Sequence, residues 1–145
     1  GFAALLFPKT VFVHCVREPL DTCLSNFFQI FPPGIDFAYD LSDLGQYYRS
    51  YQRLMTHWQR VLGSRLVTVG YEELVNDAEP VLRSLLENLD LPWDRACLSH
   101  EENVGRIDTL SNYQVRQPLN TGSTERWRHY ERHLEPLRQA LEGKD

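Results

Sequence analysis

Apolar residues along the chain follow a strand pattern first and a helical pattern directly after it. Residues 11–16 form a short apolar run rich in β-branched side chains, which is typical of a strand buried on both faces. Arg17 and Glu18 end this run, and Pro19 suits the first position of a helix, where its missing N–H costs nothing. Apolar residues then recur at helical spacing, at Leu20, Cys23, Leu24, Phe27, Phe28 and Phe31. The pattern predicts a buried strand that ends at an arginine, followed by a helix that residues 32–34 terminate.

The middle of the chain predicts a long helix, a second strand and two further helices. The long helix is amphipathic, closes at Gly63, and carries an apolar and aromatic stripe that we expect in the core, made of Leu44, Tyr48, Tyr51, Met55, Trp58 and Leu62. Residues 66–69 form a second apolar run, which predicts another buried strand. Asp77 and Asp94 are expected N-caps of the next two helices. Two buried strands joined by a long connection predict an α/β fold with a parallel sheet and flanking helices.

The last third of the chain begins with a polar stretch and ends with another amphipathic segment. Residues 100–124 show little periodicity, and a loop of that length in a compact domain is usually functional. Apolar positions then return with a helical period at Trp127, Tyr130, Leu134, Leu137 and Leu141. Pro136 must kink or divide this segment. Because no linker or repeat interrupts the sequence, we expect all 145 residues to belong to one domain.

Composition and charge exclude several classes of protein. Hydrophobic residues make up 42% of the sequence and aromatic residues 12%, as in a folded globular chain. No apolar run approaches 18 residues, so we expect no membrane-spanning helix. The net charge of −5 argues against a nucleic-acid-binding scaffold. Cys15, Cys23 and Cys97 form no paired framework and no metal-binding spacing, which predicts reduced, buried thiols in a cytoplasmic protein.

Candidate chemistry in the sequence centres on anion binding. The chain contains no Gly-x4-Gly-Lys-Ser/Thr loop and no Gly-x-Gly-x-x-Gly motif, and residues 100–104 lack the second histidine of a zinc-protease helix. We therefore predict no metal site, and we expect His14 to be a core residue of the first strand. Arg17 lies where a strand ends and a helix begins, a position at which a guanidinium group can grip a phosphate. On residue chemistry alone, a surface or ion-paired arginine is the more common explanation for Arg17.

Two segments of the sequence resemble the nucleotide-binding segments of a known enzyme family. The run Arg-Glu-Pro-Leu-Asp-Thr-Cys-Leu-Ser after an apolar strand resembles the segment with which sulfotransferases bind the 3′-phosphate of 3′-phosphoadenosine 5′-phosphosulfate (PAPS). In that family an arginine and a serine eight residues later hold the phosphate, which implies Arg17 and Ser25 here. Tyr-Glu-Glu-Leu-Val, after the second strand, resembles the family's Tyr-Glu-x-Leu segment and implies Tyr71 as a nucleotide contact. Without the resemblance, Tyr71 is equally well explained as a packing aromatic.

The polar stretch extends the resemblance. Residues 109–130 are similar to the loop that covers the nucleotide in bacterial sulfotransferases related to the tyrosylprotein enzymes. That similarity implies Ser111 and Arg126 as cofactor contacts. Arg126 also precedes the helix predicted from Trp127, and a helix N-terminus favours an anion. The chain departs from the tyrosylprotein enzymes at Gln29, where they carry a basic residue, so the 3′-phosphate has one contact fewer. Other arginines of this region, Arg116, Arg128 and Arg132, are expected on a solvated face.

The resemblance implies the C-terminal portion of a sulfotransferase domain with a P-loop-like fold. Its reaction transfers a sulfuryl group from PAPS to a hydroxyl or amine of a small-molecule or peptide acceptor, without a metal. The family's first phosphate loop and the segment with the catalytic base, a glutamate in the most similar enzymes, are expected upstream of residue 1. We therefore expect the 145-residue chain to bind phosphoadenosine but to be inactive alone. We also expect it to self-associate through its apolar residues 2–7.

Two other functions remain open on the sequence. One is a phosphoryl-transfer enzyme with the same fold, which would need its own phosphate loop upstream. The other is a non-catalytic nucleotide-binding or interaction module that keeps these residues without the reaction.

Overall fold

The computed structural model describes residues 1–99 and 122–143 in two compact units. Of the described residues, the helical unit contains 1–12, 17–66 and 122–143, and the strand unit contains 13–16 and 67–99. Among the described residues, no helix combines the length and apolar character needed to cross a membrane.

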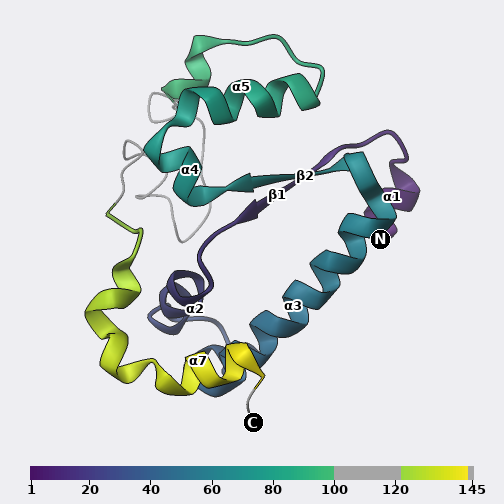
Figure 1. Ribbon diagram of the computed structural model, residues 1–145. Coiled ribbons are helices and arrows are strands. Elements are labelled where there is room, and N and C mark those ends of the chain that lie inside the picture. Colours follow the sequence, from purple (N-terminus) through teal and green to yellow (C-terminus); the bar gives the residue numbers. More distant parts are fainter. Residues whose placement is uncertain (100–121, 144–145) are drawn as a thin grey trace. The chain divides into compact units, whose positions relative to one another are not determined.

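The strand unit contains a small parallel sheet. Strands β1 (Phe12–Val16) and β2 (Leu66–Gly70) pair with each other and run in the same direction (Figure 1). The connection between them contains helices of the helical unit, as the alternation of strand and helix patterns predicts. After β2 the chain continues into α4 (Tyr71–Asn76), α5 (Ala78–Asn88) and the 3-10 helix η3 (Arg95–Leu98). The predicted α/β class with a parallel sheet and flanking helices is therefore confirmed.

Strand β1 and the cap of α5 differ from the sequence-based expectation, whereas the cap of η3 agrees with it. Strand β1 alternates between half-buried and exposed side chains, with Val13 and Cys15 exposed, so the prediction of a strand buried on both faces is wrong. Such alternation is typical of a strand with one covered face. Asp94 caps η3 by accepting a hydrogen bond from the Ala96 N–H at 2.8 Å, as predicted. Asp77 occupies the N-cap position of α5, but its side chain makes no capping hydrogen bond.

The helical unit is built from seven helical elements among the described residues. They are α1 (Phe2–Leu6), α2 (Pro19–Phe27), η1 (Asp36–Tyr39), α3 (Leu41–Leu62), η2 (Gly63–Arg65), η5 (Arg126–His133) and α7 (Glu135–Glu142). Their buried core consists of side chains from α2, α3 and the C-terminal segment, namely Leu20, Cys23, Leu24, Leu44, Leu134 and Leu137. The C-terminal segment therefore contributes Leu134 and Leu137 to the core that buries the apolar side chains of α2. Figure 1 shows α7 against the end of α3 that bears its first turns.

Helix boundaries follow the local signals of the sequence, with one exception. Pro19 is in the first turn of α2, Gly63 caps α3 with a φ of 54°, and Pro136 lies in the first turn of α7, so it divides the C-terminal segment after His133. Helix α2 ends at Phe27, four residues before the predicted Phe31.

The early end of α2 has a local cause. Phe31 precedes Pro32, and a residue before proline avoids the helical region. Its N–H and carbonyl group bond instead to the Tyr39 hydroxyl, at 2.8 and 3.1 Å.

A glycine permits the close approach of α7 to α3. Gly45 is buried in the first turns of α3. A Cβ atom added there would lie 2.6 Å from Cβ of Ala140 and 3.2 Å from the carbonyl oxygen of Leu137, both on α7. Since real Cβ atoms do not approach so closely, α7 can occupy this position only against a glycine.

The three cysteines differ in their environments. Cys23 is buried in the core, whereas Cys15 and Cys97 are exposed. The prediction of buried thiols is therefore right for Cys23 and wrong for the other two. Burial, with a further contribution from the nearby Glu18 carboxylate, raises the pKa of Cys23 to about 12.

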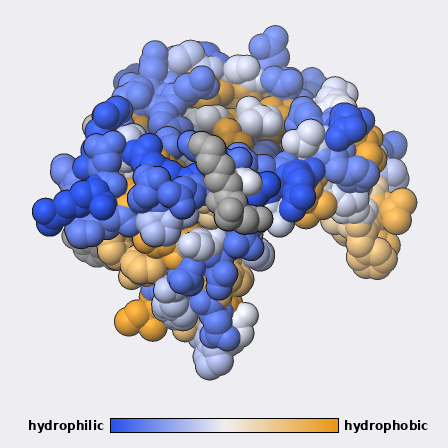
Figure 2. All heavy atoms as spheres, turned by 60° about the horizontal axis from the view of Figure 1, so that its bottom comes forward, coloured by the Kyte–Doolittle hydropathy of each residue, from blue (hydrophilic) through white to orange (hydrophobic). Residues whose placement is uncertain are grey.

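Helix α1 exposes most of its apolar surface. Phe2 is 76% exposed and Leu5 80%, and Leu6 and Phe7 are also exposed. Figure 2 shows a cluster of orange spheres at the right of the view, the side on which Figure 1 places α1. Self-association through these residues stays a prediction.

We expect the thiol of Cys23 to resist alkylation in the folded chain. At pH 8, a pKa of about 12 instead of 9.0 leaves about a thousandfold less thiolate, and burial also blocks access. Mass spectrometry after iodoacetamide treatment should find Cys15 and Cys97 modified and Cys23 intact. In denaturant all three should react alike, and fast native labelling of Cys23 would contradict its burial.

The raised pKa of Cys23 also predicts a pH dependence of stability. The free energy of unfolding should fall as pH rises above 9.0, because the unfolded chain then releases the thiol proton more readily than the folded chain.

We expect Gly45→Ala to destabilise the chain although alanine favours helix by about 1 kcal/mol. The added methyl group would collide with Ala140 and Leu137, and overpacking of this kind costs about 1–3 kcal/mol. Chemical denaturation measures the difference. Ser50→Ala, on the exposed part of α3, is the matched control and should change stability by no more than about 0.5 kcal/mol. A Gly45→Ala chain more stable than the wild type would show that α7 does not pack there.

Candidate functional site

Arg17 joins the end of β1 to the segment that precedes η5. Its side chain is half-buried, and its Nη2 atom donates a hydrogen bond to the carbonyl oxygen of Ser123. Its own carbonyl oxygen accepts a bond from the Tyr48 hydroxyl at 3.4 Å. A guanidinium group carries five N–H donors, so a bond to one carbonyl does not prevent it from contacting an anion. Contacts on both sides thus fix Arg17 in place.

Glu18 caps α2 with its own carboxylate. The Oε2 atom of Glu18 accepts a hydrogen bond from the N–H of Asp21 at 2.8 Å. The N–H groups of a first helical turn have no partner within the helix, so this bond satisfies one of them. The chain's own negative charge thus stands where we expected the helix N-terminus to attract an anion. The sequence signal for this cap, an acidic residue directly before Pro19, was not used in the prediction.

Asp21 accepts a hydrogen bond from the N-terminus of η5, as Glu18 does from that of α2. Asp21 is 2% exposed, and its Oδ1 atom accepts a hydrogen bond from the backbone N–H of Trp127 at 2.9 Å. Trp127 is the second residue of η5, so the anion at the N-terminus of that helix is also internal. Sequence reasoning missed Asp21, although a carboxylate between Leu20 and Cys23 in an apolar run is a recognisable signal.

Together these contacts connect two segments that are far apart in the sequence. The bond from Arg17 to Ser123 and the bond from Trp127 to Asp21 each join residues 106 positions apart. Arg17 and Asp21 are four positions apart, as are Ser123 and Trp127. We call this pair of hydrogen bonds the clasp. Because it contains two bonds, the clasp fixes both the position and the direction of the chain that leads into η5.

Arg126 lies next to the C-terminal end of α2. Its guanidinium carbon is 5.4 Å from the ring centroid of Phe28, a cation–π contact. The Phe28 ring also meets Tyr130 of η5 edge to face, with centroids 5.0 Å apart. Arg126 itself is exposed, so its charge faces solvent while the aromatic ring holds its position.

Ser25 lies between the two contacts that α2 makes with η5. Asp21, Ser25 and Phe28 occupy positions i, i+4 and i+7, so they share one face of α2. Asp21 binds the start of η5, Phe28 contacts Arg126, and the exposed Ser25 stands one turn from each. A side chain on a helix leans toward the preceding turn, which brings the Phe28 ring toward Ser25. The structure therefore gathers Ser25 and Arg126 on one surface of the helical unit.

The other two predicted contacts are Tyr71 and Ser111. Tyr71 is the first residue of α4, directly after β2, and is half-buried in the strand unit. It thus occupies the carboxyl end of a strand, where ligands of parallel sheets bind. Ser111 and Arg116 lie outside the residues that the structure describes. Arg17, Ser25 and Arg126 belong to the helical unit.

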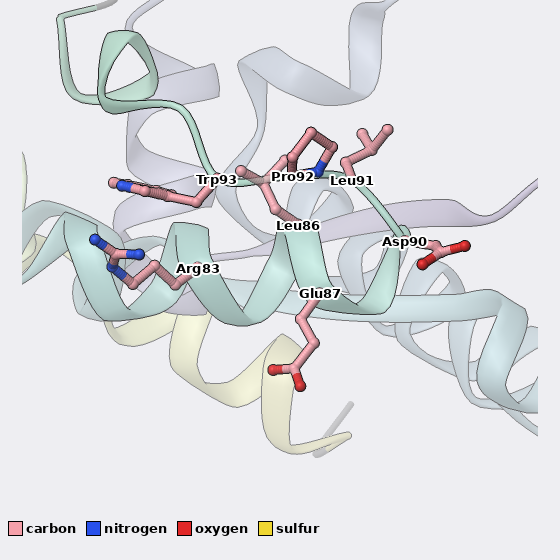
Figure 3. Close-up of a pocket in the computed structure, with 7 residues that line it drawn as sticks. All are labelled: Arg83, Leu86, Glu87, Asp90, Leu91, Pro92 and Trp93. Carbon is pink, nitrogen blue, oxygen red and sulfur yellow. The ribbon is translucent and has the colours of Figure 1, made fainter.

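A separate hollow occurs in the strand unit (Figure 3). It measures about 420 Å³ and lies between α5 and the segment after it. The guanidinium carbon of Arg83 is 4.1 Å from the ring centroid of Trp93, and the same group pairs with Glu79 at 2.6 Å. Tyr71 is not among the described residues that line this hollow.

Donor groups for a metal do not gather in the described part of the chain. No three side chains of histidine, cysteine, aspartate or glutamate lie close enough together there to hold an ion. The described site instead offers two guanidinium groups and a hydroxyl, which suit phosphate oxygens.

Comparison with known proteins identifies the family. A family model described as "Sulfotransferase family" matches residues 1–95, a segment that includes Arg17, Ser25 and Tyr71. This chain belongs to that family, which confirms the resemblance found in the sequence.

Individual relatives agree with the family match. Protein-tyrosine sulfotransferase 1 of Danio rerio is 29% identical over 144 residues, which cover 87% of this chain and 38% of that protein. Protein-tyrosine sulfotransferase A of Caenorhabditis elegans is 32% identical over 132 residues, 84% of this chain and 34% of that protein. An uncharacterised protein of Aquifex aeolicus (strain VF5) is 32% identical over 145 residues, 98% of this chain and 19% of that protein. The chain thus spans well under half the length of these relatives.

We expect Glu18→Ala to destabilise the chain by about 1 kcal/mol, because the substitution removes the cap of α2. Thermal and urea unfolding measure the loss. Glu18→Gln keeps an oxygen acceptor and should lose less. The control is Glu87→Ala, an exposed acid in the last turn of α5, where its charge does not favour the helix. Equal effects of Glu18→Ala and Glu87→Ala would argue against the cap.

Proposed function

We propose that this chain supplies nucleotide-binding residues of a PAPS-dependent sulfotransferase. Arg17 and Ser25 hold the 3′-phosphate, Tyr71 and Ser111 contact the nucleotide, and Arg126 binds its 5′ side. Membership of the sulfotransferase family supports the class of reaction. The observation that carries the residue assignment is the placement of Ser25 and Arg126 on one surface, with Arg17 joined to the same C-terminal segment through Ser123.

The charges around this surface also support an anionic ligand of a particular kind. The N-termini of α2 and η5 are both occupied by carboxylates of the chain, so they contribute little attraction for a further anion. Among the described residues, the positive charges that we assign to the ligand are therefore those of Arg17 and Arg126. Guanidinium groups grip phosphate oxygens through two parallel hydrogen bonds, and a serine hydroxyl adds one more donor.

In the proposed reaction PAPS supplies the sulfuryl group. The bond from sulfur to the 5′-phosphate oxygen breaks as the acceptor oxygen or nitrogen attacks in line. Phosphoadenosine leaves, and a general base, a glutamate in the enzymes that the chain resembles, would take the acceptor's proton. Such transfers depend on positioning and on fixed charges around the transferring group. Arg17 and Ser25 would anchor the nucleotide at its 3′ end, and Arg126 would offset the negative charge that develops near the leaving phosphate.

Gln29 limits the strength of the 3′-phosphate site. It follows α2 and is exposed, and it stands where the resemblance leads us to expect a basic residue. A neutral amide cannot replace the charge, so we propose that the phosphate relies mainly on Arg17.

The acceptor is a hydroxyl or amine on a small molecule or peptide. Relatives named protein-tyrosine sulfotransferase make the phenolic hydroxyl of a peptide tyrosine the first acceptor to test.

The two rival functions predict different ligands. A phosphoryl-transfer enzyme should bind ATP in preference to phosphoadenosine, and a module without nucleotide binding should show no heat with either ligand in calorimetry. Preference for phosphoadenosine over ATP would argue against a phosphoryl-transfer enzyme and against a module that has lost nucleotide binding, whereas sulfuryl transfer from PAPS would distinguish the sulfotransferase from a nucleotide-binding module without catalysis.

We expect Arg17→Ala to weaken phosphoadenosine binding about tenfold or more, because a lost charge-assisted hydrogen bond costs about 1.5–3 kcal/mol. Calorimetry with phosphoadenosine and with adenosine 5′-phosphate separates the roles of the two phosphates. Adenosine 5′-phosphate should lose much less affinity, because it lacks the phosphate that Arg17 holds and is affected only through the bond from Arg17 to Ser123. Arg132→Ala, an exposed arginine of η5, is the matched control and should leave both affinities unchanged. Equal weakening for both ligands would refute a role specific to the 3′-phosphate.

A further inference from the structure

We propose that Asp21 is a positioning residue, whose carboxylate fixes the N-terminus of η5 against α2 and thereby places Arg126 beside Ser25. This inference rests on the proposed function in one respect, that Arg126 contacts the nucleotide. The structural part of the inference stands on contacts that do not involve a ligand.

The first observation is the burial of the Asp21 carboxylate. Asp21 is the one buried charged residue in the described part of the chain, at 2% exposure, among core side chains such as Leu20 and Cys23. Its second oxygen, Oδ2, is also buried and has no hydrogen-bond partner among the described residues. Burying a carboxylate that is only partly satisfied costs stability, and an apolar side chain would avoid that cost. A role beyond packing accounts for its presence.

The second observation is where the other oxygen binds. The N–H of Trp127 belongs to the first turn of η5, whose N–H groups have no partner within the helix. A carboxylate both accepts this hydrogen bond and complements the positive end of the helix. Arg126 directly precedes Trp127, so the bond fixes the backbone from which the Arg126 side chain extends.

The third observation is backbone strain inside the clasp. Glu125 has a φ of 56°, in the left-handed region that residues other than glycine rarely adopt. A strained residue persists only where its surroundings fix it. The two hydrogen bonds of the clasp lie on either side of Glu125, at Ser123 and Trp127. The turn at Glu125 directs the chain so that Arg126 meets Phe28.

A common face of α2 connects these contacts. Asp21 holds the start of η5, Phe28 contacts the Arg126 guanidinium, and Ser25 stands between them on the same face. Loss of the bond from Trp127 to Asp21 releases one end of this arrangement. Arg126 would then move relative to Ser25 although the substitution touches neither residue.

The experiment compares Asp21→Ala with Asp21→Asn in the full 145-residue chain. Asparagine keeps an oxygen that can accept the Trp127 N–H, whereas alanine does not. The control is Thr22→Val, because Thr22 carries a buried hydroxyl in the same turn that has no partner among the described residues. If Asp21→Ala does not fold, Asp21→Ser replaces it, since its shorter side chain cannot reach Trp127.

Two readouts need no nucleotide. Amide hydrogen exchange at Trp127 should quicken about tenfold or more in Asp21→Ala, remain within about threefold in Asp21→Asn, and stay unchanged in Thr22→Val. In NMR spectra, the Arg126 side-chain signals that change position in Phe28→Leu are those that sense the Phe28 ring. In Asp21→Ala the same signals should move to the positions that they have in Phe28→Leu. Unchanged exchange at Trp127, or an intact ring shift, would overturn the positioning role.

A third readout tests the connection with function. Arg126→Ala should weaken phosphoadenosine binding about tenfold, and Asp21→Ala should weaken it by a similar factor. If Asp21 acts through Arg126, the double variant should bind no more weakly than Arg126→Ala alone. Losses that multiply would show that Asp21 acts on stability in general and would overturn the inference. If the wild-type chain binds no phosphoadenosine, the proposed function fails, while exchange and ring shift still decide the role of Asp21.

Discussion

The burial of Leu134 and Leu137 against α2 and α3 is the interaction on which the helical unit depends. Leu137 is completely buried, and Leu134 is 1% exposed. Their hydrophobic contacts hold the C-terminal segment in place, so that η5 meets the face of α2 that carries Ser25. Gly45 is part of the same constraint, because it allows α7 to approach closely enough to bury Leu137. The geometry of the candidate site is thus a consequence of core packing, with hydrogen bonds refining it.

Acidic and basic side chains at the candidate site make different contacts. Carboxylates of Glu18 and Asp21 satisfy the backbone donors of two helix N-termini. In the described part of the chain, the guanidinium groups of Arg17 and Arg126 supply positive charge at that surface. The movement of both guanidinium groups is restricted, because the Ser123 carbonyl accepts a hydrogen bond from Arg17 and the Phe28 ring contacts Arg126. A ligand would therefore meet donors whose positions are already largely fixed, which reduces the entropy lost on binding.

Local signals in the sequence were sufficient for the two strands and the longer helices, but not for the short helices α1 and α4 or for the contacts between elements. Pro19, Gly63 and Pro136 mark helix ends through backbone restrictions that act within a few residues, so these boundaries could be predicted. The contacts of Asp21 with Trp127 and of Phe28 with Arg126 could not, because they depend on how η5 packs against α2. The resemblance to sulfotransferases supplied Ser25 and Arg126 as candidates. Neither the resemblance nor the periodicity indicated that two carboxylates would occupy the helix termini.

The clasp also has a consequence for the order in which the chain folds. Its two hydrogen bonds each join residues 106 positions apart, so neither can form until the ribosome has synthesised Ser123 and Trp127. Until then, the apolar face of α2 lacks the contacts of Leu134 and Leu137, and the carboxylate of Asp21 lacks the N–H of Trp127. Solvation of that carboxylate by water keeps the nascent helix polar at one end of its apolar surface. The same group that is costly in the finished core therefore lowers the tendency of the unfinished chain to aggregate.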